Sequence, residues 1–192
     1  MNMKDFIRTF TMVMLVLMMT VSAASAASVE EKRNSIRNMA DKTLAKLYGI
    51  HPSSRAAVES AAGYAVFSIT DAKIVFLGGG GGKGMAVNNS TGEETFMKVG
   101  NVQVGFGLGI KKFEVVFVFE TDEALAEFTD KDKGWSVGGQ GTLAATDSVN
   151  GASFEGAVSA GKNVWMYQMT DKGLEISLTV RGIRYYKDSD LN

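Results

Sequence analysis

The residues with the clearest chemical potential form a glycine run that ends in a lysine. Gly78 to Gly82 are five consecutive glycines, and Lys83 and Gly84 follow them. Glycine has no Cβ, so its backbone adopts conformations closed to other residues and lets a second group approach closely. Successive backbone N–H groups can form an anion-binding concavity, and a lysine in such a loop could meet a lipid phosphate. The segment therefore predicts either an anion-binding backbone or a place where two elements pack at short range.

The glycine run does not match a nucleotide-binding loop. The G-x-x-x-x-G-K-[ST] pattern would need glycine at 77 and serine or threonine at 84, where this chain has Leu77 and Gly84. No helical pattern follows, so no helix N-terminus would face a phosphate. We predict no nucleotide site and take a phospholipid contact as the hypothesis, with ordinary surface charge as its alternative. The candidate lipid-binding residues are Gly79, Gly80, Gly81, Gly82, Lys83, Gly84, Lys111 and Lys112.

Residues suited to catalysis are scarce. The single histidine, His51, lies beside Pro52 in a turn, and no G-x-S-x-G elbow occurs. The chain has no cysteine, which excludes thiol catalysis, zinc–thiolate sites, disulfides and the lipid-modified cysteine of a lipoprotein. The carboxylates are scattered and form no calcium-loop pattern. We predict no catalytic residue, no metal, no cofactor and no enzymatic activity, with a hydrolase of unfamiliar site as an alternative.

The first residues have the composition of a secretory signal peptide. Lys4 and Arg8 precede an apolar run at 10–21, and a small-residue cleavage site follows at 24–26. The run is shorter than the roughly 20 apolar residues of a spanning helix. We predict a signal peptide at 1–26, cleaved after Ala26 to within one or two residues. The protein would then be periplasmic or secreted, with peripheral attachment to a membrane left open.

The mature chain, residues 27–192, has the size of one domain. Without Lys4, Arg8 and Asp5, the 20 basic and 21 acidic residues become 18 and 20, a net charge of −2. A general nucleic-acid binder would carry a basic excess. We therefore predict no nucleic-acid partner.

Residues 27–62 predict a pair of helices. Apolar residues including Val29, Ile36, Ala40 and Leu47 recur at helical spacing, and Gly49 is expected to end this helix. A shorter helix is expected from Ser53 or Ser54, one of which caps it, to about 61. We expect the first helix to lie on a sheet; the alternative is a membrane-surface helix, although its stripe lacks Trp and Phe.

Residues 63–186 are predicted to be mainly β, because the apolar period changes to two. Short strands are expected on either side of the glycine run, and residues 89–92 (NSTG) predict a hairpin turn. Residues 113–119 (FEVVFVF) are mostly apolar, which indicates a central strand buried on both faces. Thr121 can cap a short helix that Leu125 and Phe128 dock. Further strands are expected over 102–110, 135–145, 154–160, 164–169 and 174–186.

These elements predict an α+β fold. It is a β-rich single domain, an antiparallel, strongly curved sheet or barrel-like sandwich, with an N-terminal helix pair and one short helix inserted between strands. Glycines recur at 105, 107 and 109 and at 138, 139 and 141, which suggests one patch bare of side chains. Close packing by a helix or neighbouring strand is the first interpretation of that patch. A lipid-facing surface with Lys83 at its edge is the second.

The order of these segments resembles the SYLF domain family of lipid-binding proteins. The resemblance runs from about Ala61 to Tyr186 and rests on several short motifs in order, each weak alone. They are 62–67 (AGYAVF), 79–87 (GGGGKGMAV), 104–109 (VGFGLG), 115–119 with Thr121 and 126–128 (AEF), 135–139 (WSVGG) and 171–174 (DKGL).

The resemblance implies a compact β-rich domain with affinity for membrane lipids. It makes residues 27–192 a single SYLF-like lipid-binding domain and supplies no catalytic residue. Eukaryotic relatives are associated with phosphoinositides and actin, a partner set that should not transfer to a chain with this signal peptide. The expected function is an exported lipid-binding or membrane-associated protein that contacts phospholipid through a glycine-rich surface. The alternative is a small outer-membrane β-barrel or a periplasmic structural protein of the envelope.

Overall fold

The computed structural model describes residues 28–130, 132, 134–137, 154, 156–170, 173–174 and 183–192. Within the two long strands, the side chains of 73–78 and 101–111 are not described. The predicted signal peptide, the third glycine cluster at 138–141 and the middle of the last predicted strand lie outside the described residues.

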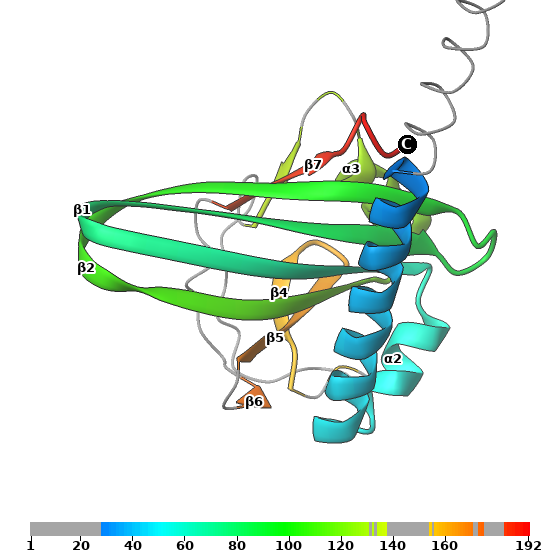
Figure 1. Ribbon diagram of the computed structural model, residues 1–192. Helices are drawn as coiled ribbons and strands as arrows, with labels where there is room; N and C mark the ends of the chain where they lie inside the picture. Colours follow the sequence, from blue (N-terminus) through cyan, green and yellow to red (C-terminus); the bar gives the residue numbers. More distant parts are fainter. Residues whose placement is uncertain are drawn as a thin grey trace, which may run out of the picture.

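The described elements confirm the α+β class, and each strand pair among them is antiparallel. Residues 28–50 form the N-terminal helix, which lies across one end of the sheet (Figure 1). The elements that follow are α2 (Ser54–Ser60), β1 (Gly63–Asn88), β2 (Glu94–Phe119), α3 (Asp122–Thr129), β3 (Trp135–Ser136), β4 (Val158–Gly161), β5 (Val164–Thr170), β6 (Gly173–Leu174) and β7 (Ile183–Lys187).

The sheet is built on one long hairpin that bends back on itself. β1 and β2 each contain 26 residues and pair from Gly63↔Phe119 to Val87↔Glu94. Both strands reverse at the same end of the molecule, so each contributes two arms (Figure 1). β7 pairs with the first arm of β2, and β5 pairs with its second arm. The result is a strongly curled sheet with an inner and an outer face.

The glycine run lies inside β1 and does not separate two strands. We expected glycine to interrupt the strand, and this expectation was wrong. The ladder continues through the run, from Gly79↔Val102 to Gly84↔Met97. Sheet hydrogen bonds come from the backbone, so a glycine segment can pair when the partner strand and the tertiary packing hold it in place.

The predicted hairpin turn is confirmed. The N–H of Asn88 donates to the carbonyl of Glu93 at 3.0 Å, and Gly92 has a φ of +72°. The side-chain amide of Asn89 donates to the carbonyls of Val58 and Ala61 at the end of α2. The turn therefore closes the hairpin and also ties α2 to the sheet.

Each face of the sheet has its own hydrophobic cluster. The inner cluster joins side chains such as Phe67, Phe117 and Tyr185 to α3, whereas the outer cluster joins Val66 and Val116 to the N-terminal helix. Residues 115–119 have no exposed surface, which confirms the prediction of a strand buried on both faces. Alternation of side chains along a strand sends successive residues to opposite clusters.

The N-terminal helix packs on the sheet through the predicted stripe. Ile36, Ala40 and Leu47 are at most 4% exposed. Two details of the prediction were wrong. The helix continues through Gly49 to residue 50, and Gly49 does not adopt the positive φ of a glycine that ends a helix. Ser53 occupies the N-cap position of α2, but its hydroxyl pairs with Nδ1 of His51 instead of capping the helix.

The predicted cap of α3 is confirmed. The Oγ1 of Thr121 accepts a hydrogen bond from the N–H of Ala124 at 3.3 Å. We expect Thr121→Ala to lower the free energy of unfolding by about 1 kcal/mol, since one N–H at the helix start loses its partner. Urea denaturation of the variant and the wild type measures this loss. Thr121→Ser keeps the oxygen and should recover most of the stability; equal losses in both variants would contradict a capping role.

Candidate functional site

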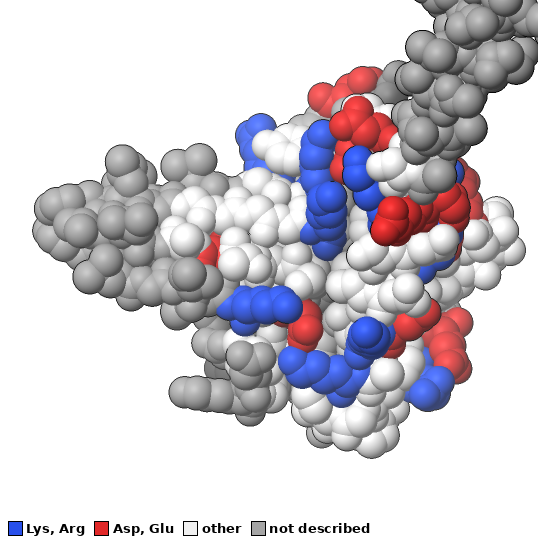
Figure 2. All heavy atoms as spheres, viewed as in Figure 1, with Lys and Arg blue, Asp and Glu red and all other residues white. Residues whose placement is uncertain are grey.

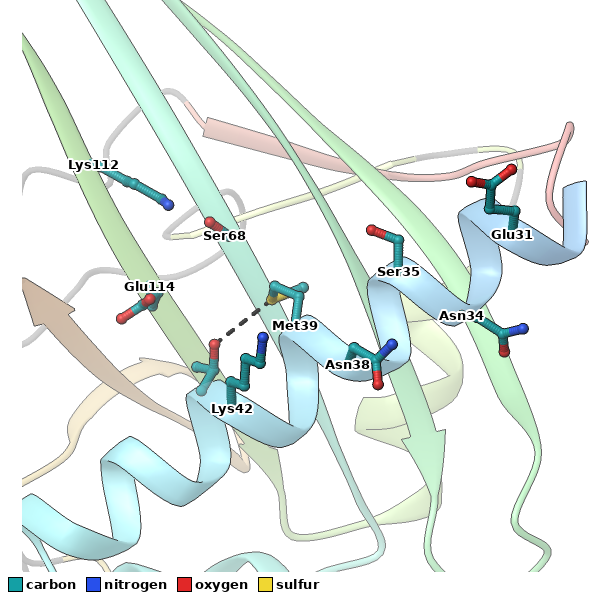
Figure 3. Close-up of a pocket in the computed structure, with 10 residues that line it drawn as sticks. Glu31, Asn34, Ser35, Asn38, Met39, Lys42, Ser68, Lys112 and Glu114 are labelled. Atoms are coloured by element: carbon teal, nitrogen blue, oxygen red, sulfur yellow. Dashed lines mark hydrogen bonds between the residues drawn. The ribbon is translucent and has the colours of Figure 1, made fainter. Parts of the chain in front are cut away.

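A groove of about 630 Å³ runs between the N-terminal helix and the outer face of the sheet. We call it the helix–sheet groove. Its lining is mostly polar (Figure 3), whereas the buried contacts between the helix and the sheet are apolar. It is lined by Glu31, Asn34, Ser35, Asn38, Met39, Lys42, Thr43, Ser68, Lys112 and Glu114.

Ion pairs set the position of the helix above the groove. The Nζ of Lys46 lies 2.6 Å from Oε2 of Glu114 on β2. Arg37 binds Glu94 at the start of β2, with its Nη2 2.8 Å from Oε2, and also binds Glu30. Hydrogen bonds to Glu94 and Glu30 raise the pKa of Arg37 well above its usual value, and the bond from Arg37 lowers the pKa of Glu30. These ion pairs fasten the helix to β2 at two positions.

Two lysines line one end of the groove, Lys42 from the helix and Lys112 from β2. Lys42 precedes Lys46 by one helical turn, and Lys112 precedes Glu114 by two residues on the same face of β2. The contact between Lys46 and Glu114 thus brings Lys42 and Lys112 to the same end. Ser68 lies directly opposite Glu114 in the register, and the amine of Lys112 points toward it (Figure 3). Neither Lys42 nor Lys112 forms an ion pair with another described residue.

The structure divides the predicted lysines. Lys112 is exposed and lines the groove. Lys83 is exposed on the same outer face, since Met85, two residues later, belongs to the outer cluster, but Lys83 is not among the groove residues. Lys83 lies opposite Lys98 of β2 in the strand pairing. The Nζ of Lys98 is 3.7 Å from Oδ1 of Asp188. Lys111 of β2 lies opposite Asp71 of β1 in the strand pairing, and the side chain of Lys111 is not described.

Positive side chains gather beside the N-terminal helix. Figure 2 shows Lys and Arg on the helix and on the neighbouring sheet surface, with carboxylates near the start of the helix and others interspersed among the basic side chains. Charge of one sign on part of a surface raises the local concentration of oppositely charged ligands. On this face Lys42 and Lys112, which form no ion pair with another described residue, are groups able to attract an anion.

The predicted glycines serve packing at two positions. A Cβ on Gly82 would clash with the carbonyl oxygen of Ser68, and a Cβ on Gly84 would clash with the carbonyl oxygen of Val66 and the ring of Phe67. The second arm of β1 therefore lies directly against the backbone of the first. Close packing, the first interpretation of the glycines, is confirmed at these two positions. Gly79 and Gly81 are exposed, and Gly80 is half-buried.

Sequence reasoning missed Lys42 and Ser68. Lys42 is one of several charged residues beside the apolar stripe of the helix, and Ser68 lies within a strand without any motif around it. No sequence signal distinguishes Lys42 from the other charges of the helix, because its role depends on which part of the sheet the helix crosses. The contact of Lys46 with Glu114, 68 residues away, provides that information.

A second groove of about 470 Å³ lies near the start of β2, and most of its polar side chains are already bound to other parts of the protein. Its Arg37 is bound to carboxylates, and the Nε of Arg33 donates to the carbonyl of Leu191 at 2.9 Å. The side-chain amide of Asn192 pairs with the N–H and the carbonyl of Phe96. These contacts fasten the last described residues to β2 and the helix.

The lining of the helix–sheet groove is suited to a ligand that has one anionic group and is otherwise polar and uncharged. Two lysines and a hydroxyl supply charge and hydrogen bonds, and the amide of Asn38 supplies both donors and an acceptor. The amide oxygen of Asn34 accepts a hydrogen bond from Arg37 at 2.7 Å. Among the described residues, no group of three or more His, Asp or Glu side chains could hold a metal ion. No described helix has the length and apolar character needed to cross a membrane.

Comparisons with known proteins give two matches. A family model described as "Ysc84: Las17-binding protein actin regulator" matches residues 100–192. Beta cell expansion factor A of Aeromonas veronii is 31% identical over 166 residues. That match covers 85% of this chain and 60% of the relative, so the chain spans about three-fifths of the length of the curated relative.

Proposed function

The chain belongs to the Ysc84 (SYLF) domain family, and from this we propose that it is an exported, non-catalytic protein that binds phospholipid head groups in the helix–sheet groove. The resemblance of its motifs to lipid-binding SYLF domains favours a lipid ligand. The composition of residues 1–26 favours export to the periplasm or out of the cell. The actin-regulator wording describes the family, and we do not extend it to this chain.

The observation that carries the proposal is the pair of lysines at the end of the groove. Lys42 lines the groove from the helix and Lys112 lines it from β2, and neither forms an ion pair with a described carboxylate. Glu114 beside them is paired with Lys46. An ammonium group near an anionic membrane surface contributes roughly 1 kcal/mol of attraction. Lys83 on the same face would add attraction without entering the groove.

Sedimentation with anionic vesicles at low salt tests the proposal. We expect the double variant Lys42→Glu, Lys112→Glu to lower the vesicle affinity of the mature protein by at least about a hundredfold, because two attractive charges become repulsive. Lys162→Glu, in the turn between β4 and β5, makes one such reversal away from the groove and should bind within about threefold of wild type.

Two results would contradict the proposal. Wild-type protein that stays in the supernatant at low salt would argue against membrane binding. A double variant that sediments like wild type would move the contact away from the groove. Mass spectrometry of lipid that copurifies with the mature protein provides a separate test, since a bound phospholipid should appear in wild-type protein and be depleted in the double variant.

A further inference from the structure

The helix–sheet groove separates positive from negative charge along its length. Lys42 and Lys112 lie at one end, whereas Glu31 lies near the start of the helix. At about 1.5 Å per residue, roughly 16 Å of helix separates Glu31 from Lys42. The stretch between these ends carries the neutral polar side chains of Asn34, Ser35 and Asn38 (Figure 3).

The positive end has the capacity for one phosphate. Glu114, two residues after Lys112 on β2, is the lining carboxylate at this end of the groove. The Nζ of Lys46, 2.6 Å from Oε2 of Glu114, offsets its negative charge. Lys42 on the helix and Lys112 on β2 leave two unpaired ammonium groups at this end, and the hydroxyl of Ser68 lies beside Lys112 as a further hydrogen-bond donor (Figure 3). Glu31 opposes a second phosphate farther along the groove.

This arrangement discriminates among head groups by their charge. In a head group that carries an amine, the ammonium lies within a few bonds of the phosphate and would meet the two lysines before it could reach Glu31. A head group with several phosphates would extend negative charge toward Glu31. A hydroxylated remainder suits the neutral middle of the groove, where amides and hydroxyls both donate and accept hydrogen bonds.

We infer that the groove selects a head group with one phosphodiester and an uncharged, hydroxylated remainder, as in phosphatidylglycerol. This inference rests on the proposed function, because it names the lipid class for the same site. Lys42, Lys112 and Ser68 hold the phosphodiester, and Ser35 and Asn38 face the hydroxyl groups. Lys83 lies outside the groove and attracts anionic membranes of any head group.

Vesicles matched in surface charge test the selection. Mature protein is titrated with phosphatidylcholine vesicles that contain phosphatidylglycerol, phosphatidylserine or a polyphosphorylated phosphoinositide. We expect about tenfold tighter binding to phosphatidylglycerol than to the other two, the equivalent of one charge-assisted hydrogen bond. Lys112→Met should remove the preference, whereas Lys83→Met should weaken binding to all three vesicles by a similar factor.

Soluble glycerophosphoglycerol separates the head group from the membrane. We expect it to shift NMR signals of groove residues in wild-type protein and to leave them unchanged in Lys112→Met. Lys112-dependent vesicle binding with equal affinity for all three lipids, and no shift with the soluble compound, would overturn the inference and leave the proposed function in place. Binding of the soluble compound without any vesicle binding would overturn the membrane function and retain the head-group chemistry. Binding of neither would overturn both.

Discussion

Phe128→Ala is expected to lower the free energy of unfolding by about 3–5 kcal/mol. Phe128 has no exposed surface and is the largest of the α3 side chains in the inner cluster, which also contains Ala124 and Leu125. Truncation removes buried apolar surface and leaves a cavity that its neighbours can fill only in part. Its ring centroid lies between 4.8 and 6.0 Å from the rings of Phe67, Phe117, Phe119, Trp135 and Tyr185.

Guanidinium chloride denaturation, followed by far-UV circular dichroism, measures this loss. Glu127→Ala is the matched control, because Glu127 is exposed on the same helix and the change should stay within about 0.5 kcal/mol. Phe128→Leu should lose less than Phe128→Ala, since it retains part of the volume. A loss below about 1 kcal/mol for Phe128→Ala would show that the inner cluster does not depend on α3.

Gly84→Ala is the second large effect, with an expected loss of about 3 kcal/mol or more. The added methyl would clash with the carbonyl oxygen of Val66 and with the ring of Phe67. The Phe67 ring cannot move away freely, because it packs against Phe117 and Tyr185 with ring centroids 6.1 and 4.8 Å apart. The arms of β1 would have to separate to make room.

Gly81→Ala is the control within the same glycine run. A Cβ on Gly81 would meet only the carbonyl oxygen of Val99 at 3.4 Å, which is ordinary van der Waals contact. Thermal denaturation should therefore show a much smaller loss than for Gly84→Ala. Gly49→Ala, with open space around its Cβ, should be neutral or stabilise the N-terminal helix by up to about 1 kcal/mol. Similar losses at Gly81 and Gly84 would argue that glycine is needed for backbone conformation and not for close packing.

Several elements could be predicted from the sequence because short-range patterns specify them. The stripe with Ile36 and Leu47 predicted the buried side of the first helix, and Thr121 predicted the start of α3. Residues 113–119 indicated a doubly buried strand through their continuous apolar character. Each of these signals spans at most a few helical turns or one strand, so local spacing alone expresses it.

The glycine run shows where local reasoning ends. Its composition signalled close approach of another group, but glycine propensity alone argued against a strand. Pairing with β2 supplied the backbone hydrogen bonds that keep the run extended. The partner for the close approach, the backbone of Val66 and Ser68, lies in the other arm of the same strand. That contact exists only because β1 and β2 reverse together.

The sequence by itself therefore determined the β-rich class, the family resemblance, the hairpin turn and the faces that become buried. The tertiary structure decided what the glycines touch and which charges meet. Lys112 was a candidate from the sequence, but Lys42 could not be distinguished from the other charges of the helix. The place where the helix crosses the sheet is set by contacts between residues far apart in the chain, such as Lys46 with Glu114. Local patterns record which side of an element avoids water. They do not record which element will cover that side, and the groove exists only between the two.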